Sequence, residues 1–342
     1  MNNGKILEIR NLKIHFGEGE KEIHAVRGID LECYPGEVLA IVGESGSGKS
    51  LTGKAVLGIL PSGARVVDGE IIYKGENILG LCEREMNGIR GTEIAIVPQD
   101  PFTSLDPVMK IGRQVGEGLL ERNKDKAAVK ARVIELLGEV GIPEPEKRYN
   151  EYPHRFSGGM RQRIAIATAV SMEPSLLICD EPTTALDVTI EAQILDLFLK
   201  LKRERGVSII FITHDLGVVA RISDRVAVMY AGKIVECGTA EDIFYRPKHP
   251  YTWALLSSIP TGDGGRLYAI PGMVPDLVGG IVGDAFRDRS EYAMRIDFVL
   301  DPPRIDISPT HYVYSWLYHK DAPEFSMPSE LMERIKGMEA AE

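Results

Sequence analysis

The sequence contains no apolar run long enough to cross a membrane. A transmembrane helix needs about 20 consecutive apolar residues, and the runs in this chain of 342 residues are shorter. Residues Met1 to Lys5 also lack the apolar core of a secretion signal. We therefore expect a soluble chain whose association with a membrane is made through protein partners.

Cysteine is scarce, and basic residues are outnumbered by acidic ones. The four cysteines, at positions 33, 82, 179 and 237, lack the paired spacing of a metal site, so we interpret them as reduced thiols. The formal net charge of −10 argues against nonspecific binding to nucleic acid, because a phosphate backbone attracts basic surfaces. The remaining composition, 44% hydrophobic and 26% charged, fits a main domain with smaller additions.

A glycine-rich phosphate loop is the first motif that the chain does contain. Residues Gly43 to Ser50 read Gly-Glu-Ser-Gly-Ser-Gly-Lys-Ser, after the apolar run Val38 to Val42 and before a helix-compatible segment. This strand, loop and helix context is the one that a P-loop requires. Backbone N–H groups would surround phosphate oxygens, Lys49 would reach the β and γ phosphates, and Ser50 would bind magnesium. An ordinary glycine-rich turn is the disfavoured alternative, since every position of the pattern agrees.

Two adjacent carboxylates end a second apolar run. Asp180 and Glu181 follow Leu176 to Cys179, which is typical of a buried parallel strand. Asp180 would hold magnesium, and Glu181 would be the base that polarises the attacking water. A strand that merely ends in two acids before a turn is the alternative, and the phosphate loop makes it the weaker one.

Three more polar elements have positions suited to a nucleotide site. Gln99 and His214 each follow a strand-like run, and ligands of open α/β sheets bind at strand ends. Residues Ser157 to Arg163, with a serine and two glycines opening a basic helix, predict a second phosphate-binding element. A structural glutamine or histidine is the common alternative for each residue alone, and their co-occurrence favours the functional interpretation.

In this order the motifs resemble those of the nucleotide-binding subunits of ABC transporters, over about residues 5 to 245. The resemblance implies an α/β fold, namely a P-loop NTPase cassette with a mixed β subdomain and a RecA-like core. It also implies a helical insertion at about residues 100–172. We assign residues 1–259 to this cassette.

The resemblance also assigns roles to individual residues. Glu181, His214 and Lys49 are the expected catalytic residues, and Ser50, Gln99 and Asp180 the expected magnesium ligands. Asp187 belongs to a D-loop, Ala185 to Asp187, near a subunit seam, and Phe16 would stack on adenine, with a core phenylalanine as its alternative. The expected ATP-binding residues are Phe16, Gly43, Glu44, Ser45, Gly46, Ser47, Gly48, Lys49, Ser50, Leu51, Gln99, Ser157, Gly158, Gly159 and Asp187.

One cassette in the chain makes a partner necessary. The helical insertion carries Ser157 away from the phosphate loop of its own chain, so we expect a dimer in which each ATP lies between two subunits. The second ATPase is either a paralogue or another copy. Two membrane permeases would complete the transporter on the cytoplasmic side of the membrane, and residues 100–106 are candidates for receiving them, with helix packing as the alternative. An extracytoplasmic solute-binding protein would take part indirectly.

The resemblance narrows to the importers of di- and oligopeptides. It is carried by residues 98–107, by methionine at position 160, and by the run Tyr245 to Thr252. Members of that group also import nickel or oligosaccharides, so these solutes remain alternatives. A soluble ABC ATPase acting on DNA or ribosomes is a rival of another class, disfavoured because the chain has no long coiled coil and no second cassette. A P-loop kinase is the last alternative.

Residues 260–342 resemble the C-terminal extension of the same importers, and eight of the 20 prolines fall there, which predicts an irregular segment. The family often binds an iron–sulfur cluster in this region through four cysteines. The corresponding positions here are Asp284, Ser290, Asp297 and Ser315. Because such clusters are held by cysteine sulfur, we expect no cluster. We expect a tail held by ordinary packing, in which Arg287 or Arg289 can pair with Asp284 or Asp297, and a replacement metal is the disfavoured alternative.

Overall fold

The computed structural model describes residues 4–184, 186–259 and 269–339. Ala185 of the predicted D-loop lies outside the described residues. Residues 260–268, where we expected the extension to begin, also lie outside them. The chain divides into two compact units. Unit one comprises Met1–Ile6, Cys33–Val38 and Gly80–Ile212, and unit two comprises Leu7–Glu32, Leu39–Leu79 and Thr213–Glu342.

Unit one is built on three parallel strands in the order β8-β7-β6. These are β6 (Ile94–Val97), β7 (Leu176–Asp180) and β8 (Ser208–Thr213). Every residue of β7 and β8 is buried, as is usual for parallel strands covered on both faces. Phe198 packs edge-on against Phe211 of β8, with ring centroids 5.7 Å apart, and helps to fill the core of the unit.

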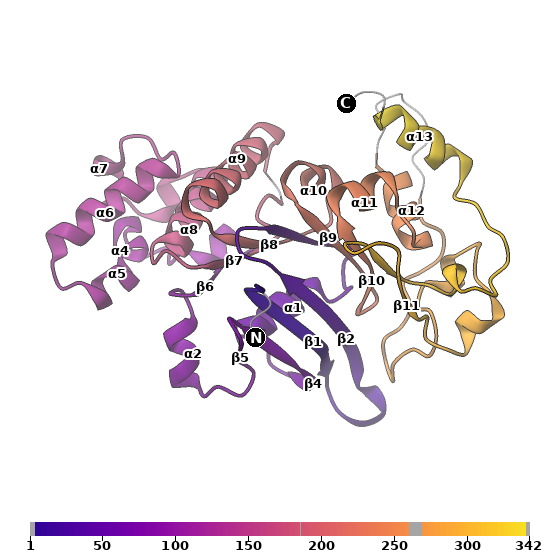
Figure 1. The fold of residues 1–342 in the computed structure, drawn as a ribbon. Helices are drawn as coiled ribbons and strands as arrows, with labels where there is room; N and C mark the ends of the chain where they lie inside the picture. The colour runs from indigo at the N-terminus through magenta and orange to yellow at the C-terminus, as the bar shows by residue number, and fades with distance from the viewer. Residues whose placement is uncertain (1–3, 185, 260–268, 340–342) are drawn as a thin grey trace. The chain divides into compact units, whose positions relative to one another are not determined.

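All helices of unit one except α2 follow β6 in sequence, and Figure 1 shows α4 to α7 gathered in one group. They confirm the predicted helical insertion. The helix α6 carries apolar residues at helical spacing, and Val129, Val133, Leu136 and Leu137 are all buried. The elements are α2 (Glu83–Ile89), α3 (Pro101–Ser104), α4 (Ile111–Val115), α5 (Glu117–Arg122), α6 (Lys126–Glu139), α7 (Pro145–Arg148), η2 (Pro153–Arg155), α8 (Gly158–Val170) and α9 (Val188–Arg205).

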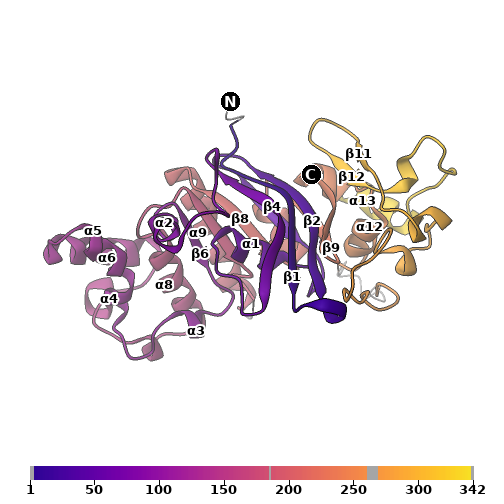
Figure 2. The same cartoon turned by 90° about the horizontal axis from the view of Figure 1, so that it is seen from below.

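Unit two contains a sheet in the order β2-β1-β4-β5, whose long strands lie side by side in Figure 2. They are β1 (Leu7–Phe16), β2 (Ile23–Cys33), β4 (Ala64–Tyr73) and β5 (Glu76–Asn77), with η1 (Gly19–Lys21) between the first two. Strand β1 pairs antiparallel with β4. Its alternating buried residues, such as Ile14, pack on one face. This sheet is the mixed β layer that the sequence predicted.

A second group of strands in unit two runs β11-β12-β10-β9-β3. Strand β3 is parallel to β9, and the remaining pairs are antiparallel. The strands are β3 (Val38–Val42), β9 (Arg225–Tyr230), β10 (Lys233–Thr239), β11 (Arg304–Asp306) and β12 (Tyr312–Tyr314). The helices are α1 (Lys49–Val56), α10 (Leu216–Ile222), α11 (Ala240–Tyr245), α12 (Pro250–Ser257) and α13 (Ser329–Glu339), with the 3-10 turns η3 (Arg287–Arg289), η4 (Arg295–Phe298) and η5 (Trp316–Tyr318).

The C-terminal extension packs into unit two. It is irregular, as expected, apart from the short pair β11 and β12, the 3-10 turns and α13. Strand β12 pairs with β10, and the extension's Phe286 and Leu317 share one buried core with Val228 and Trp253. The extension is therefore continuous with the strands that precede it.

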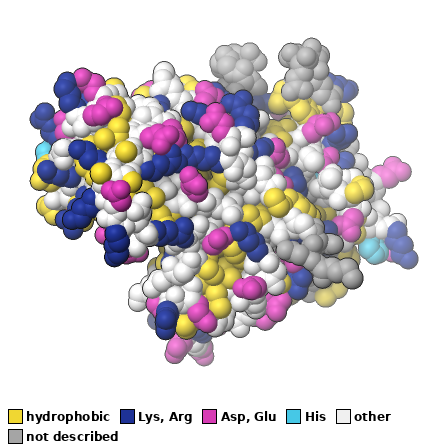
Figure 3. All heavy atoms as spheres, turned by 60° about the vertical axis from the view of Figure 1, so that its left-hand side comes forward, with side chains coloured by type: hydrophobic (Ala, Val, Ile, Leu, Met, Phe, Trp, Pro, Cys, Tyr) yellow, Lys and Arg dark blue, Asp and Glu magenta, His cyan; other side chains and the backbone are white. Residues whose placement is uncertain are grey.

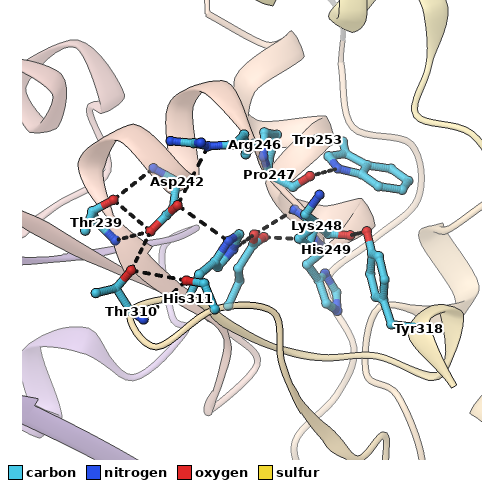
Figure 4. A network of polar contacts seen from close by, with 12 residues as sticks. Thr239, Asp242, Arg246, Pro247, Lys248, His249, Trp253, Thr310, His311 and Tyr318 are labelled. Carbon is cyan, nitrogen blue, oxygen red and sulfur yellow. Dashed lines mark hydrogen bonds and ion pairs between the residues drawn. The ribbon is translucent and has the colours of Figure 1, made fainter.

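A network of polar contacts joins the start of α12 to the extension (Figure 4). Glu236 of β10 is fully buried and accepts hydrogen bonds from the backbone N–H groups of Lys248 and His249. The Nε2 atom of His311, in the extension, lies 2.8 Å from Glu236 Oε1. Trp253 donates from Nε1 to the carbonyl of Pro247 at 2.9 Å, which closes the same turn.

The sequence predicted reduced cysteines and no membrane-spanning helix. The four cysteines carry thiols rather than disulfides, and burial raises the pKa of the Cys179 thiol well above its usual value. Within the described residues, no helix combines the length and apolar character that crossing a bilayer requires.

Candidate nucleotide site

The predicted phosphate loop, Gly43 to Ser50, lies in unit two, between β3 and α1. Gly43, Gly46 and Gly48 have φ values of 154°, 79° and 102°, in the region that favours glycine. Tertiary packing adds a second demand, since a Cβ on Gly43 would lie 2.0 Å from the carbonyl oxygen of Met229. Position 43 therefore has no room for a side chain, because the backbone of β9 lies directly against the loop.

Lys49 points back into this loop. Its Nζ donates to the carbonyl oxygens of Gly43 at 2.8 Å and Glu44 at 2.9 Å, and the residue is 5% exposed. Ser50 follows on α1, whose N-cap is Gly48, and Leu51 continues the helix. The ammonium group is thus directed at the space enclosed by the loop, where it can meet phosphate oxygens.

The rest of the loop is tied to neighbouring backbone. The Ser47 N–H donates to the Glu44 carbonyl at 3.2 Å, and the Ser47 carbonyl accepts from Gly232 at 3.0 Å. Ser45 is exposed in the same turn. Tyr251, which the sequence did not single out as a site residue, accepts a hydrogen bond on its hydroxyl from the Glu44 N–H at 2.8 Å.

Unit one brings Gln99 and Glu181 together. Gln99 Nε2 donates to Glu181 Oε2 at 2.8 Å, and the Thr184 hydroxyl donates to the same oxygen at 3.1 Å. The Glu181 N–H donates to the carbonyl of Ile212, which anchors the residue beside the end of β8. Asp180, the last residue of β7, is 5% exposed. The Gln99 amide and the Glu181 carboxylate are therefore in contact, and Asp180 ends the strand directly before Glu181.

The predicted second phosphate-binding element opens α8 in unit one. The Ser157 hydroxyl caps the helix by accepting from the Met160 N–H at 3.4 Å. Gly158 and Gly159 form the first helical positions. A Cβ on Gly159 would lie 2.6 Å from Cγ2 of Ile190, so close packing against α9 also requires glycine there. Asp187 caps α9 by accepting from the Ile190 N–H at 3.0 Å.

Phe16 and His214 both belong to unit two. Phe16 ends β1, is partly buried, and pairs in the sheet with Ala64. His214 directly follows β8 and is exposed. Their positions at strand ends agree with the sequence pattern.

The segment after Gln99 exposes apolar side chains. Asp100 caps the short helix α3 by accepting from the Phe102 N–H at 2.8 Å. Phe102 and Val108 are 59% and 81% exposed. The Arg161 guanidinium lies 4.3 Å from the centroid of the Phe102 ring and orients it. The segment therefore contains a helix cap, Asp100, and exposed apolar side chains.

The four residues at the family's cysteine positions cap local turns. Each side chain accepts a hydrogen bond from a backbone N–H: Asp284 from Phe286, Ser290 from Tyr292, Asp297 from Met294 and Ser315 from Leu317. Burial raises the pKa of both aspartates. A set of two carboxylates and two hydroxyls, already engaged with backbone, does not fit an iron–sulfur cluster.

Among the described residues, neither Arg287 nor Arg289 forms a direct ion pair with Asp284 or Asp297, although the charge of Arg287 opposes the rise in the pKa of both aspartates. Arg289 pairs with Glu44, and the Arg287 Nε lies 3.6 Å from the neighbouring Asp288. The Glu44 partner was not predicted because a partner 245 residues away is invisible to local sequence reasoning.

Two family models match the chain. One, described as ABC transporter, matches residues 26–184, and the other, described as Oligopeptide/dipeptide transporter, C-terminal region, matches residues 235–296. The oligopeptide transport ATP-binding protein OppD of Bacillus subtilis (strain 168) is 53% identical over 337 residues, covering 97% of this chain and 94% of that protein. The chain belongs to the ATP-binding subunits of the oligopeptide and dipeptide ABC transporters. It is therefore an ABC-type ATPase that binds nucleotide, as the sequence predicted.

Further members of the family give the same result. The dipeptide transport ATP-binding protein DppD of Lactococcus lactis subsp. cremoris (strain MG1363) is 50% identical, covering 98% of this chain and 97% of that protein. Among solved structures, the ATP-binding cassette MJ0796, in a dimeric post-hydrolysis state bound to ADP and Pi, matches with a TM-score of 0.62 at 26% identity. It covers 68% of this chain and 98% of that one. The predicted ABC cassette fold is confirmed.

Proposed function

We propose that this chain powers the import of di- or oligopeptides by binding and hydrolysing MgATP. The observation that carries the proposal is the 53% identity to an oligopeptide transport ATP-binding protein across 97% of the chain. The loop geometry supports it, because Lys49 is directed into a glycine-lined turn at the start of a helix. Ser50, Asp180 and Gln99 are the proposed ligands of magnesium.

In the proposed mechanism Glu181 orients the attacking water, and Gln99 holds the Glu181 carboxylate through its 2.8 Å hydrogen bond. Lys49 and His214 stabilise the charge that develops on the transferring phosphoryl group. Magnesium, when bound, would neutralise charge on the β and γ phosphates. Phe16 supplies a ring for adenine.

The proposed assembly contains a second ATPase subunit and two permeases. The solved cassette MJ0796 is dimeric. We propose a comparable dimer in which Ser157, Gly158 and Gly159 meet the ATP held by the partner's loop, with Asp187 near the seam. The exposed Phe102 supports docking of a permease at residues 100–106, on the cytoplasmic side of the membrane. A solute-binding protein outside the membrane would deliver the peptide.

The surface is compatible with protein partners rather than nucleic acid. Lys and Arg side chains are interspersed with Asp and Glu on the face drawn in Figure 3, and the formal net charge is −10. Proteins that bind nucleic acid nonspecifically concentrate positive charge.

The first test is hydrolysis by a Glu181→Gln variant. We expect phosphate release that depends on Mg²⁺ in the unchanged chain, a loss of about 100-fold or more in the variant because the base is absent, and unchanged ATP binding. Phosphate release is measured on the purified chain and on the complex with its partner ATPase, alongside gel filtration with ATP, where the variant should accumulate a dimer.

Glu204→Gln is the matched control, since Glu204 lies on α9 of the same unit with its side chain 61% exposed. It should hydrolyse ATP normally. The transported solute is tested by measuring uptake of a labelled tripeptide in cells that lack the chain, before and after the chain is supplied again. Restoration of nickel or oligosaccharide uptake in place of peptide uptake would contradict the assignment of the transported solute.

A further inference from the structure

Arg289 of the extension forms a bidentate ion pair with the second residue of the phosphate loop. Its Nη1 lies 2.6 Å from Glu44 Oε2 and its Nη2 lies 3.0 Å from Glu44 Oε1. This geometry matches the planar guanidinium to the carboxylate and gives a directional, charge-assisted contact. The extension therefore touches the predicted nucleotide site of its own chain.

The surroundings of Arg289 hold the guanidinium in place. Its Nε donates to the carbonyl of Pro271 at 2.8 Å, and Nη1 also donates to the Tyr230 hydroxyl at 3.1 Å. The side chain is 5% exposed, and the guanidinium carbon lies 5.8 Å from the centroid of the Phe286 ring. An arginine side chain stays protonated in proteins, and the hydrogen bond to Glu44 raises the pKa of Arg289 further.

Glu44 is held at three points. Its carboxylate is bound by Arg289, its N–H donates to the Tyr251 hydroxyl at 2.8 Å, and its carbonyl accepts from Lys49 at 2.9 Å. Tyr251 is fully buried and packs against Tyr230, with ring centroids 4.5 Å apart. The packed pair Tyr230 and Tyr251 therefore positions both contacts to Glu44 from outside the loop, since Tyr251 binds its N–H and Tyr230 binds Arg289.

Charge gives this arrangement a consequence for nucleotide binding. Glu44 brings a carboxylate into a loop that is assigned to a polyphosphate, and like charges at short range repel. A guanidinium within hydrogen-bond distance cancels that charge locally. Without Arg289, the carboxylate would oppose the phosphates and would also be free to turn into the loop.

We propose that Arg289 is a positioning residue for MgATP, which neutralises the Glu44 carboxylate and holds the start of the phosphate loop in the shape that accepts the nucleotide. This inference rests on the proposed assignment of Gly43 to Ser50 as the phosphate loop. It gives the extension a role in the nucleotide site of its own chain.

The test is the affinity of the full chain for a fluorescent methylanthraniloyl derivative of ATP with Mg²⁺. Arg289→Ala should weaken binding about tenfold, because a charge-assisted contact is lost and a carboxylate is left unpaired. In a chain that already carries Glu44→Gln, the same Arg289→Ala change should alter the affinity by less than about threefold, since no charge remains to be neutralised. A role in folding alone would not give this rescue.

Three further variants keep the outcomes distinct. Arg287→Ala removes a guanidinium from the same turn and should leave the affinity unchanged. Arg289→Gln is less disruptive to packing and should weaken binding as Arg289→Ala does. Lys49→Ala tests the loop itself, and undiminished binding in that variant would refute the loop assignment rather than the role of Arg289.

Two results would overturn the proposal. One is unchanged affinity in a folded Arg289→Gln variant. The other is an Arg289→Ala effect that is equally large with and without Glu44→Gln. Thermal unfolding of every variant identifies those that are folded.

Discussion

Glu181 has a backbone conformation that is uncommon for glutamate. Its φ of 46° lies in the left-handed region, which costs a residue with a Cβ about 1 kcal/mol or more. The hydrogen bonds of its N–H to Ile212 and of its carboxylate with Gln99 hold it there. The motif predicted the residue, but its strained conformation and its contact with Gln99 depend on two neighbouring strands.

At the same scale, His249 predicts how stability depends on pH. Its Nδ1 accepts the Tyr251 N–H at 3.0 Å, and burial lowers its pKa to about 4 from 6.5. Between those values the unfolded chain binds a proton that the folded chain does not. The neutral His249 therefore leaves the free energy of unfolding unchanged above pH 6.5. Below that pH the proton bound by the unfolded chain lowers the free energy of unfolding, by about 2 kcal/mol at pH 5.

The measurement is urea unfolding at pH 7.5 and pH 5, with His249→Asn as the comparison. Asparagine retains an oxygen that can cap α12 and does not titrate. The variant should lose about 2 kcal/mol less than the unchanged chain between the two pH values. An equal loss in both proteins would exclude His249 as the source.

At the scale of elements, α8 combines a helix start with a tight helix contact. Sequence reasoning identified Ser157 as the start of a helix because serine followed by glycines and a basic run is a local pattern. The reason for glycine at position 159 is tertiary, since Ile190 of α9 lies against it. Helix α13 was not predicted, although Leu331 and Ile335 stand one helical turn apart and are buried, because the prolines before it favoured irregular structure.

The predicted effect of Gly159→Ala follows from that contact. Alanine is a better helix former than glycine by about 1 kcal/mol, but its Cβ would lie 2.6 Å from a branched side chain. We expect overpacking to dominate, with a net loss of about 1 to 2 kcal/mol in the free energy of unfolding. Chemical denaturation provides the measurement.

Ile190→Ala supplies the second half of a double-mutant cycle. In that background Gly159→Ala should be neutral or stabilising, because the obstructing methyl group is gone while the helix propensity remains. Additive effects of the two changes would contradict the contact.

At the scale of the whole molecule, the extension is tied to the cassette strands of unit two by a buried polar network. His311 and Glu236 are 2% and 0% exposed, and Glu236 also fixes the start of α12. Because removing one partner of a buried pair leaves an uncompensated group, His311→Ala should reduce stability by about 3 kcal/mol. The expected observation is a lower urea midpoint.

His319→Ala is the matched control. His319 belongs to the same extension, but its side chain is 40% exposed and lies 3.6 Å from Asp321 at the surface. Its loss should cost less than about 0.5 kcal/mol. Similar costs for the two substitutions would argue against a network that joins the extension to the strands.

The sequence by itself determined the family, the cassette fold and the order of the motifs. Phosphate binding uses consecutive backbone groups, so the predicted phosphate loop, Gly43 to Ser50, is recognisable as one short segment. Only the tertiary structure decided which distant groups surround that segment. Arg289 reaches Glu44 across 245 positions of the chain, and Met229 limits Gly43, because packing brings together residues whose relation has no local pattern.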